Sequence, residues 1–269
     1  MSNFIKTVDA YDAKLVLERG KWTESVRSIS INQASGDFFV TSADISNSAI
    51  IVYPQSQSNP DATLLGNRVA LTGFSGFGAL ANPLDARIDT SNGKLWIADS
   101  GNLRILKVDA YSFLAEYAIN SILNPHALAP NPNTGGIFIK ASFDNSYGMV
   151  YYYSSTGLLQ SSFKYLDNNS NDAIALPSTL GFDHRRSRLW WTALDKVYMA
   201  DFLNNQVVKF DLSSESAVFI RGLDVHLDSG NAFVAAKLAN GAWVMAQLFR
   251  DNNRLLDYAY LPTFSQTEC

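Results

Sequence analysis

Three short runs of alternating hydrophobic residues follow one another in NPLDARIDTSNGKLWIADSGNLRILKVDAYS, residues 82–112. The runs lie at 86–88, 95–97 and 105–108. Each has the two-residue period that is typical of a strand. A turn-forming Asp and a glycine separate the runs, first Asp89 with Gly93 and then Asp99 with Gly101. The segment therefore predicts an antiparallel meander of three strands.

The same strand and turn pattern recurs along the chain, with a period of about 40 to 55 residues. A proline precedes a turn Asp or Asn by six residues three times, at Pro83 and Asp89, Pro125 and Asn131, and Pro177 and Asp183. Two further units, 28–40 and 223–235, keep the strand and turn without the proline, and their anchors are Asn32 and Asp228. A second strand with an aromatic residue follows every anchor, at Phe39, Trp96, Phe138, Trp190 and Phe233. Five related units are therefore predicted.

Repeated four-stranded units bury both of their faces when they are arranged radially, which is the β-propeller solution. We therefore predict an all-β fold, a propeller of four-stranded antiparallel blades that occupies residues 1–269 as a single domain. Six blades of about 45 residues each are the first choice, and five blades with a terminal strand pair are the alternative. Residues 4–18, FIKTVDAYDAKLVLE, echo residues 104–118, RILKVDAYSFLAEYA. N-terminal strands are thus expected to close the ring, completing a blade that begins near the C-terminus.

Residues 82–109 resemble an NHL repeat, whose usual form is a proline, a strand ending in Asp, a strand ending in Ala-Asp, an Asn, and a strand ending in Val-Asp or Phe-Asp. VYMADFLNNQVVKFD, residues 197–211, is similar to the last two thirds of that unit, and the glycine-rich residues 72–83 are similar to its usual lead-in. The resemblance covers about half of the chain and implies a β-propeller.

Composition narrows the classes of partner. The 21 Lys and Arg against 25 Asp and Glu leave a net charge of -4, so binding of nucleic acid is not expected. Cys269 is the only cysteine, which excludes an internal disulfide. No apolar run approaches the length of a membrane span, and no signal peptide is visible in the N-terminal residues. We expect a soluble protein that is cytoplasmic or assembled into a particle.

Polar residues on the innermost strands are the candidates for a binding site, because propellers usually hold ligands at the mouth of the central channel. Positions two and four residues before the anchors Asp89 and Asp228 share one strand face. They carry the polar pairs Asp85 with Arg87 and Asp224 with His226. These four residues are predicted to face the channel and to bind a polar ligand. The structural alternative is that buried polar groups pair with one another between blades.

No catalytic set is evident in the sequence. His126, His184 and His226 lie at different registers relative to their anchors, which argues against three-His zinc binding of the kind that amidating lyases of this propeller family use. The Glu-Gly-Pro opening of gluconolactonase-like lactonases is missing, as are nucleophile and nucleotide-binding motifs. We expect no cofactor, no metal and no catalytic residue.

A non-enzymatic interaction module is therefore the leading prediction, with channel-mouth loops that bind a protein or a small polar or glycan ligand. The first alternative is a metal-dependent enzyme, similar to a lactonase or a lyase, that uses Asp85, Asp224 and His226. The second is a structural subunit of a larger assembly such as a virion or a filament.

Overall fold

The computed structural model describes residues 26–32, 35–43, 48–53, 69–142, 148–164, 179–193, 195–204, 206–213, 216–241, 243–248 and 255–260. Within these residues there is no α-helix, and a 3-10 turn, η1, spans Ser100–Asn102. Accordingly, no helix of the described part is long and apolar enough to span a membrane. The prediction of an all-β fold is confirmed.

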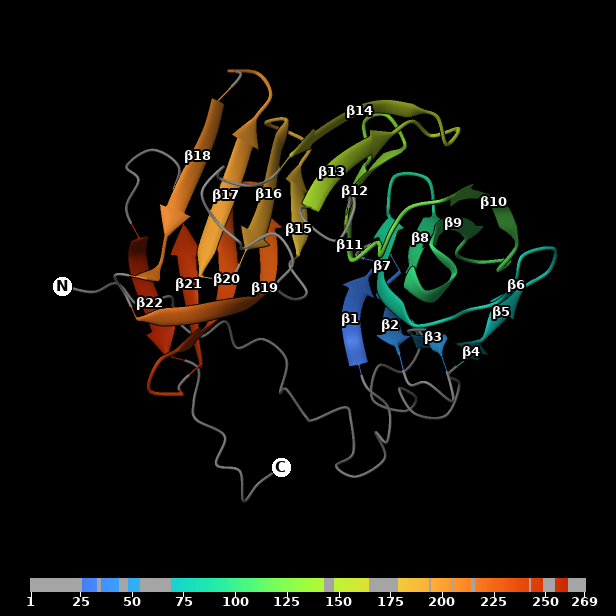
Figure 1. The fold of residues 1–269 in the computed structure, drawn as a ribbon, viewed down its shortest axis with the longest axis horizontal. Coiled ribbons are helices and arrows are strands. Elements are labelled where there is room, and N and C mark those ends of the chain that lie inside the picture. Colours follow the sequence, from blue (N-terminus) through green and yellow to red (C-terminus); the bar gives the residue numbers. More distant parts are fainter. Residues whose placement is uncertain are drawn as a thin grey trace.

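The described strands form five four-stranded antiparallel sheets and one small hairpin (Figure 1). Blade 1 consists of β1 (Val26–Ile31), β2 (Phe38–Ser42), β3 (Ala49–Tyr53) and β4 (Val69–Leu71). The hairpin of β5 (Gly73–Phe74) and β6 (Gly78–Ala79) leads into blade 2, with β7 (Pro83–Asp89), β8 (Lys94–Asp99), β9 (Arg104–Asp109) and β10 (Ala115–Asn120). Blade 3 consists of β11 (Ala127–Asn131), β12 (Gly136–Ser142), β13 (Gly148–Tyr153) and β14 (Leu159–Lys164). Blade 4 consists of β15 (Leu180–Asp183), β16 (Arg188–Ala193), β17 (Lys196–Asp201) and β18 (Gln206–Asp211), and blade 5 of β19 (Ala217–His226), β20 (Asn231–Leu238), β21 (Trp243–Leu248) and β22 (Leu255–Tyr260).

The turn between strands 1 and 2, called the first turn here, has the same geometry in all five blades. Its anchor residue pairs with the residue five positions later, as Asp89 does with Lys94. The residue four positions after the anchor has a positive φ, which favours glycine. These residues are Gly36, Gly93, Gly135, Ser187 and Gly230. The anchors are therefore Asn32, Asp89, Asn131, Asp183 and, in blade 5, His226.

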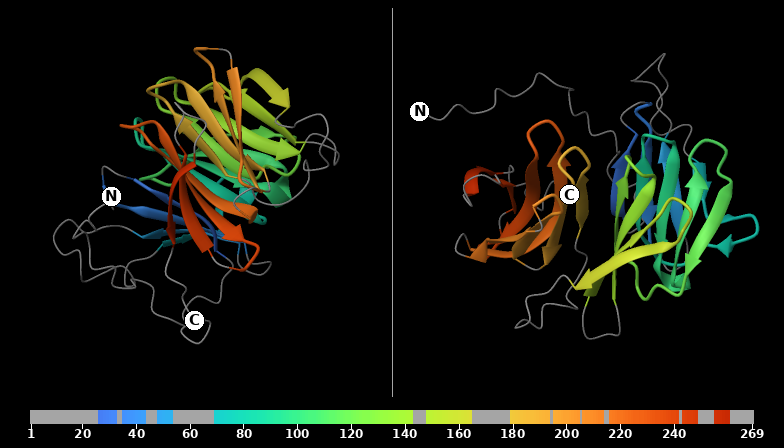
Figure 2. Two further views of the ribbon diagram at one scale, coloured as in Figure 1. Left: turned by 90° about the vertical axis from the view of Figure 1, so that its left-hand side faces the viewer. Right: turned by 90° about the horizontal axis from the view of Figure 1, so that it is seen from above.

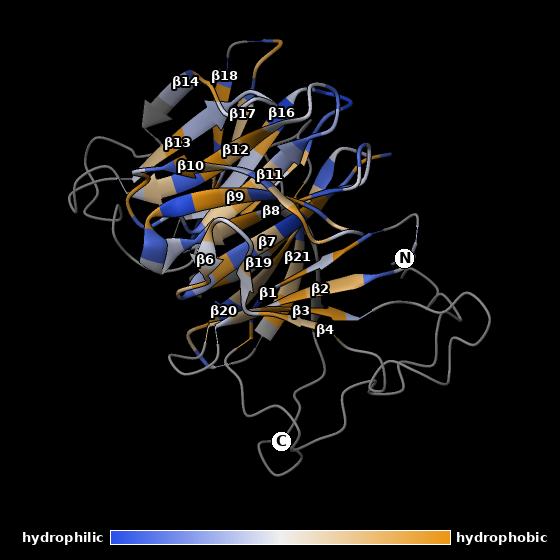
Figure 3. Cartoon of the chain, turned by 90° about the vertical axis from the view of Figure 1, so that its right-hand side faces the viewer, coloured by the Kyte–Doolittle hydropathy of each residue, from blue (hydrophilic) through white to orange (hydrophobic). Residues whose placement is uncertain are grey.

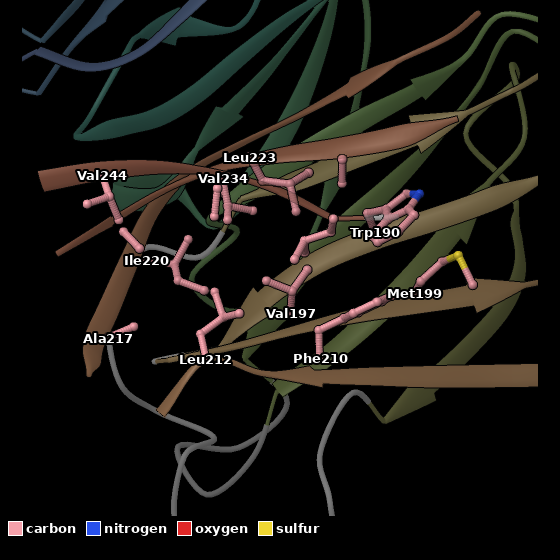
Figure 4. Close-up of a cluster of buried hydrophobic side chains, with 14 residues drawn as sticks. Trp190, Val197, Met199, Phe210, Leu212, Ala217, Ile220, Leu223, Val234 and Val244 are labelled. Atoms are coloured by element: carbon pink, nitrogen blue, oxygen red, sulfur yellow. The ribbon is translucent and has the colours of Figure 1, made fainter. Parts of the chain in front are cut away.

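Large aromatic side chains occupy one register of the second strand, and in blades 1 to 4 they pack against the next blade. Phe39, Trp96, Phe138, Trp190 and Phe233 each pair with the residue two positions before the anchor. Four of the five are buried, and Phe233 is partly buried. Figure 4 shows Trp190, Val197 and Phe210 of blade 4 in one cluster with side chains of blade 5. In Figure 3 the orange of hydrophobic residues runs through the middle of β8 and β9.

The innermost strands pack in the order β1, β7, β11, β15 and β19. No comparable packing joins β19 to β1 within the described residues, and the two end blades stand apart in Figure 2. The five-blade alternative is thus what the structure shows. The predicted closing strands fall within residues 1–25, which lie outside the described residues. Blade 5 has four strands of its own, so it needs no N-terminal strand to complete it.

The strands in residues 188–211 differ from the arrangement that the NHL resemblance implied. In an NHL unit the strand that ends in Ala200-Asp201 would be the second strand. Instead β16, which carries Trp190, is the second strand, as the series of aromatic residues predicted, and β17 is the third. The spacing between Asp183 and Asp201 is long because one complete strand lies between them.

Candidate functional site

Asp85 lies on β7 and connects blade 2 to blade 3. Both of its carboxylate oxygens accept from Arg87 Nε, at 3.0 and 3.1 Å, and Oδ2 also accepts from the Leu128 backbone N–H at 2.9 Å. Leu128 is on the innermost strand of the next blade, and Asp85 itself is buried. A buried carboxylate whose two oxygens accept three contacts from two N–H donors is well satisfied without a ligand.

Serines of blade 1 make the same kind of bond to blade 2. Ser28 Oγ accepts from Ala86 N at 3.2 Å, and Ser30 Oγ accepts from Ile88 N at 3.1 Å. Ser28 and Asp85 both lie four residues before an anchor. Side chains at this face of the innermost strands therefore satisfy the edge N–H groups of the following blade, which would otherwise lack partners.

Arg87 is the member of the first pair that keeps unused donors. Its Nε binds Asp85, and its terminal nitrogens make no hydrogen bond with the described residues. The side chain is partly exposed. A guanidinium whose two outer nitrogens are free suits an anionic or carbonyl ligand.

Asp224 and His226 lie at a register different from the one that spacing predicted. His226 is the anchor of its first turn, and its Nδ1 lies 3.0 Å from Ser229 Oγ and accepts from Ser229 N at 3.3 Å. Counted from this anchor, Asp224 lies two residues before it, as Arg87 does before Asp89, and Gly222 lies four residues before it, as Asp85 does. Both Asp224 and His226 are exposed. The two predicted pairs therefore do not occupy equivalent places.

The structure does not bring the predicted binding residues together. Asp85 and Arg87 face blade 3, whereas Asp224 and His226 are on the face of blade 5 that points away from blade 4. No three His, Cys, Asp or Glu residues of the described part lie close enough together to hold a metal ion. Ligand binding by these four residues stays a prediction.

A buried lysine that the sequence reasoning missed lies near the opposite ends of the blade 3 strands. Lys140 Nζ donates to the Thr192 carbonyl of blade 4 at 3.2 Å, and burial lowers the pKa of Lys140 to about 7. Burial, together with the nearby Lys140 charge, lowers the pKa of His126 to about 4. A lysine inside the hydrophobic run GIFIKAS is the signal that could have revealed this site.

Exposed hydrophobic residues mark the turns between strands 3 and 4, called third turns here. Neighbouring strands of a blade run in opposite directions, so the first and third turns lie at the same end of the propeller, which we call the turn end. The third turn of blade 4 is at the top of Figure 1. Four of the five most exposed large hydrophobic side chains of the described residues belong to third turns. The exposed hydrophobic residues of these turns are Tyr111 and Leu114 in blade 2, Leu158 in blade 3, and Phe202 and Leu203 in blade 4, and Leu159 at the start of β14 is exposed next to Leu158.

Each of these third turns is held by a polar side chain at its start. Asp109 Oδ1 accepts from Tyr111 N at 3.1 Å and from Ser112 N at 2.8 Å, and the bond from Ser112, with that from Lys94, keeps the pKa of Asp109 below its usual value. Asp201 Oδ1 accepts from Leu203 N at 3.2 Å. Ser154 Oγ accepts from Leu158 N at 3.2 Å. The exposed side chains therefore project from turns with fixed hydrogen bonds.

Comparisons with known proteins support the fold and leave the family open. Neither protein-family models nor curated proteins match the chain. A solved structure described as "Crystal structure of Nidogen/Laminin Complex" matches with a TM-score of 0.64, covering 88% of this chain and 81% of that one, at 13% sequence identity. At this identity the likeness shows the fold alone. The NHL resemblance thus stays a prediction.

Proposed function

We propose that the chain is a non-enzymatic binding module that recognises a protein at its turn end. The observation that carries the proposal is the row of exposed hydrophobic residues on the third turns of three successive blades. Leu203 and Leu158 are 73% and 65% exposed. Single exposed hydrophobic residues are common, but their concentration at one end of a protein is typical of an interaction surface.

Fixed turns favour binding, because little conformational entropy is lost when their side chains contact a partner. Tyr111 illustrates this point. Its ring is largely exposed, while its hydroxyl accepts from Asn32 Nδ2 of blade 1 at 3.2 Å. Tyrosine is enriched at protein interfaces for its large, rigid and partly polar surface. The nidogen/laminin structure is itself a protein complex, which agrees with a protein partner for a chain of this fold.

Substitution at the turn end tests the proposal. Leu158→Ser with Leu203→Ser should weaken retention of a saturable protein partner from the native source by at least about tenfold, as loss of central hydrophobic contacts does at other interfaces. Val207→Ser is the matched control, because Val207 is equally exposed but lies on the outer strand β18. Equal loss in the control, or no loss in the double variant, would contradict the proposal.

A small polar or glycan ligand near Arg87 is the second candidate, favoured by the free outer nitrogens of this side chain. Binding of such a ligand should fall in Arg87→Gln and persist in the Leu158→Ser and Leu203→Ser variant. Metal analysis of the purified chain addresses the enzyme alternative, since one tightly held divalent ion per chain would favour it.

A further inference from the structure

The outermost strand of each blade has one edge that pairs with no other described strand. These strands are β4, β10, β14, β18 and β22. β4 has only three residues, and register shifts interrupt the pairing of β10, β14 and β22. Short strands and bulges protect an edge from pairing with another chain. β18 has neither, because its six residues pair with β17 without a register shift (Figure 1). Among the described outer strands, β18 is therefore best suited to pair with a further strand.

Packing against blade 5 holds β18 in place through one of its faces. The buried ring of Phe210 stacks on Trp190 with the ring centroids 5.6 Å apart, in the cluster shared with blade 5. Val208, on the same face, packs against that cluster. On the other face Val207 is 66% exposed and Lys209 is exposed. The strand thus has a fixed position while one of its faces meets solvent.

The direction of the main-chain groups of β18 follows from one hydrogen bond. Leu212 N donates to the Asp195 carbonyl at 3.1 Å, so the main-chain groups of Leu212 point toward β17. In an antiparallel strand these groups point alternately to one side and the other. The N–H and C=O groups of Lys209 and Asp211 therefore point toward the outer edge, where they suit an added strand.

Symmetry limits how β18 can pair with a second copy of itself. Residues that lie opposite each other must project from the same face of the sheet, so a two-fold axis places one residue opposite its own copy. A pair centred on Lys209 would set two lysines opposite each other, which is unfavourable. A pair centred on Val208 leaves Lys209 without an opposite charge. A pair centred on Phe210 sets Lys209 opposite Asp211 and Val208 opposite Leu212 in both halves. Residues 208–212 are thus self-complementary in charge and in hydrophobicity.

We propose that β18 pairs with β18 of a second copy of the chain, antiparallel and centred on Phe210, so that the two copies of blade 4 form one continuous sheet. Lys209 of each copy faces Asp211 of the other, and the main-chain groups of these residues form hydrogen bonds across the axis. A lysine on an edge strand usually opposes such pairing, but here the opposite carboxylate offsets its charge. The contact uses the half of β18 that lies away from the turn end, so it is separate from the surface proposed to bind a partner.

Sedimentation of the full chain over a range of concentrations tests the proposal, with a reversible equilibrium of monomer and dimer as the expected result. Lys209→Asp sets carboxylates opposite each other and should weaken the dimer by at least about tenfold. Asp211→Lys sets lysines opposite each other and should do the same. A mixture of the two variants should restore the dimer, because every lysine of one chain then faces an aspartate of the other. Arg27→Asp is the matched control, since it makes the same change of charge at an exposed residue of β1 and should have no effect.

Several results would overturn the proposal: a chain that is monomeric at every concentration measured, a dimer that Lys209→Asp leaves intact, or a mixture that associates no better than its components. A dimer that only the Leu158→Ser and Leu203→Ser variant loses would place self-association at the turn end and would equally contradict pairing through β18. If Asp211→Lys does not fold, Asp211→Asn replaces it, because asparagine keeps an acceptor for Ser213 N. Its mixture with Lys209→Asp should then associate more strongly than Lys209→Asp alone, since one ion pair forms.

Discussion

At the scale of single residues, the anchor of blade 5 shows how one change of residue type hides a repeat. Four anchors are Asp or Asn, and the sequence offered Asp228 as the fifth. His226 takes the place because its Nδ1 can accept from a backbone N–H as a carboxylate does. The side-chain type favoured Asp228, but the spacing fits His226 alone: in every blade an aromatic residue lies seven positions after the anchor and a residue with positive φ lies four positions after it. The aromatic series and the glycine at position 230 identify the correct one.

The turn role of His226 leads to a stability prediction. His226→Ala should lower the free energy of unfolding by about 0.5 to 1.5 kcal/mol, the usual value of a hydrogen bond. Asp89→Ala should cost about 0.5 to 2 kcal/mol, as loss of other side-chain caps does. His226→Asn should restore stability, because Asn131 serves as the anchor in blade 3. Urea unfolding measures all three, and a neutral His226→Ala would contradict the assigned role.

Lys140 predicts a pH dependence of stability. Its pKa is about 7 in the folded protein against an ordinary value of 10.5, so between these limits the unfolded chain binds a proton that the folded chain does not. Stability should therefore rise with pH from 7 toward 10.5, by up to about 1.4 kcal/mol per pH unit for one proton. His126, with its lowered pKa, acts with the same sign between about 4 and 6.5.

The check is urea unfolding of the wild type and Lys140→Met at pH 7, 8 and 9. The wild type should gain about 1 to 2 kcal/mol over this range relative to the variant. Parallel pH profiles would show that Lys140 is charged in the folded protein.

At the scale of elements, the sequence predicted the strands better than their order within blades. The hydrophobic runs and turn residues located most strands, because period two and turn chemistry are local properties. In blade 4 the aromatic series placed Trp190 on the second strand correctly, whereas the NHL resemblance placed the strand that ends at Asp201 there. The pairing of β16 with β17 shows that the latter strand is the third. The exposed third turns were also missed, since exposure depends on which neighbours a turn has.

The first turns allow a matched test of backbone conformation. Ser187 occupies the left-handed position with φ 53°, where the other blades have glycine. Ser187→Gly should stabilise the protein by up to about 1 kcal/mol, because L-residues are strained there. Gly93→Ser should destabilise it, since φ is 68° and a Cβ would lie 2.8 Å from the Tyr111 ring. Thermal unfolding with opposite shifts supports this account, whereas shifts of the same sign would contradict it.

At the scale of the whole molecule, packing between neighbouring blades determines which blades unfold locally most easily. Each of blades 2, 3 and 4 has a described neighbour on both sides, while blades 1 and 5 have one. The sequence implied the radial arrangement through its repeat, but the number of blades and the open side depend on contacts between distant residues. In such quasi-linear arrays, stability is a sum over neighbouring interfaces.

Hydrogen exchange should therefore be slower in the middle of the array than at its ends. Second strands are the matched probes, because β2, β8, β12, β16 and β20 are paired on both edges within their own blades. Amides of β2 and β20 should exchange at least about tenfold faster than those of β12, which corresponds to about 1.4 kcal/mol less protection. Uniform exchange across the five second strands would mean that the described blades unfold locally as a single cooperative unit, and that the lack of a second described neighbour at blades 1 and 5 has no effect on stability.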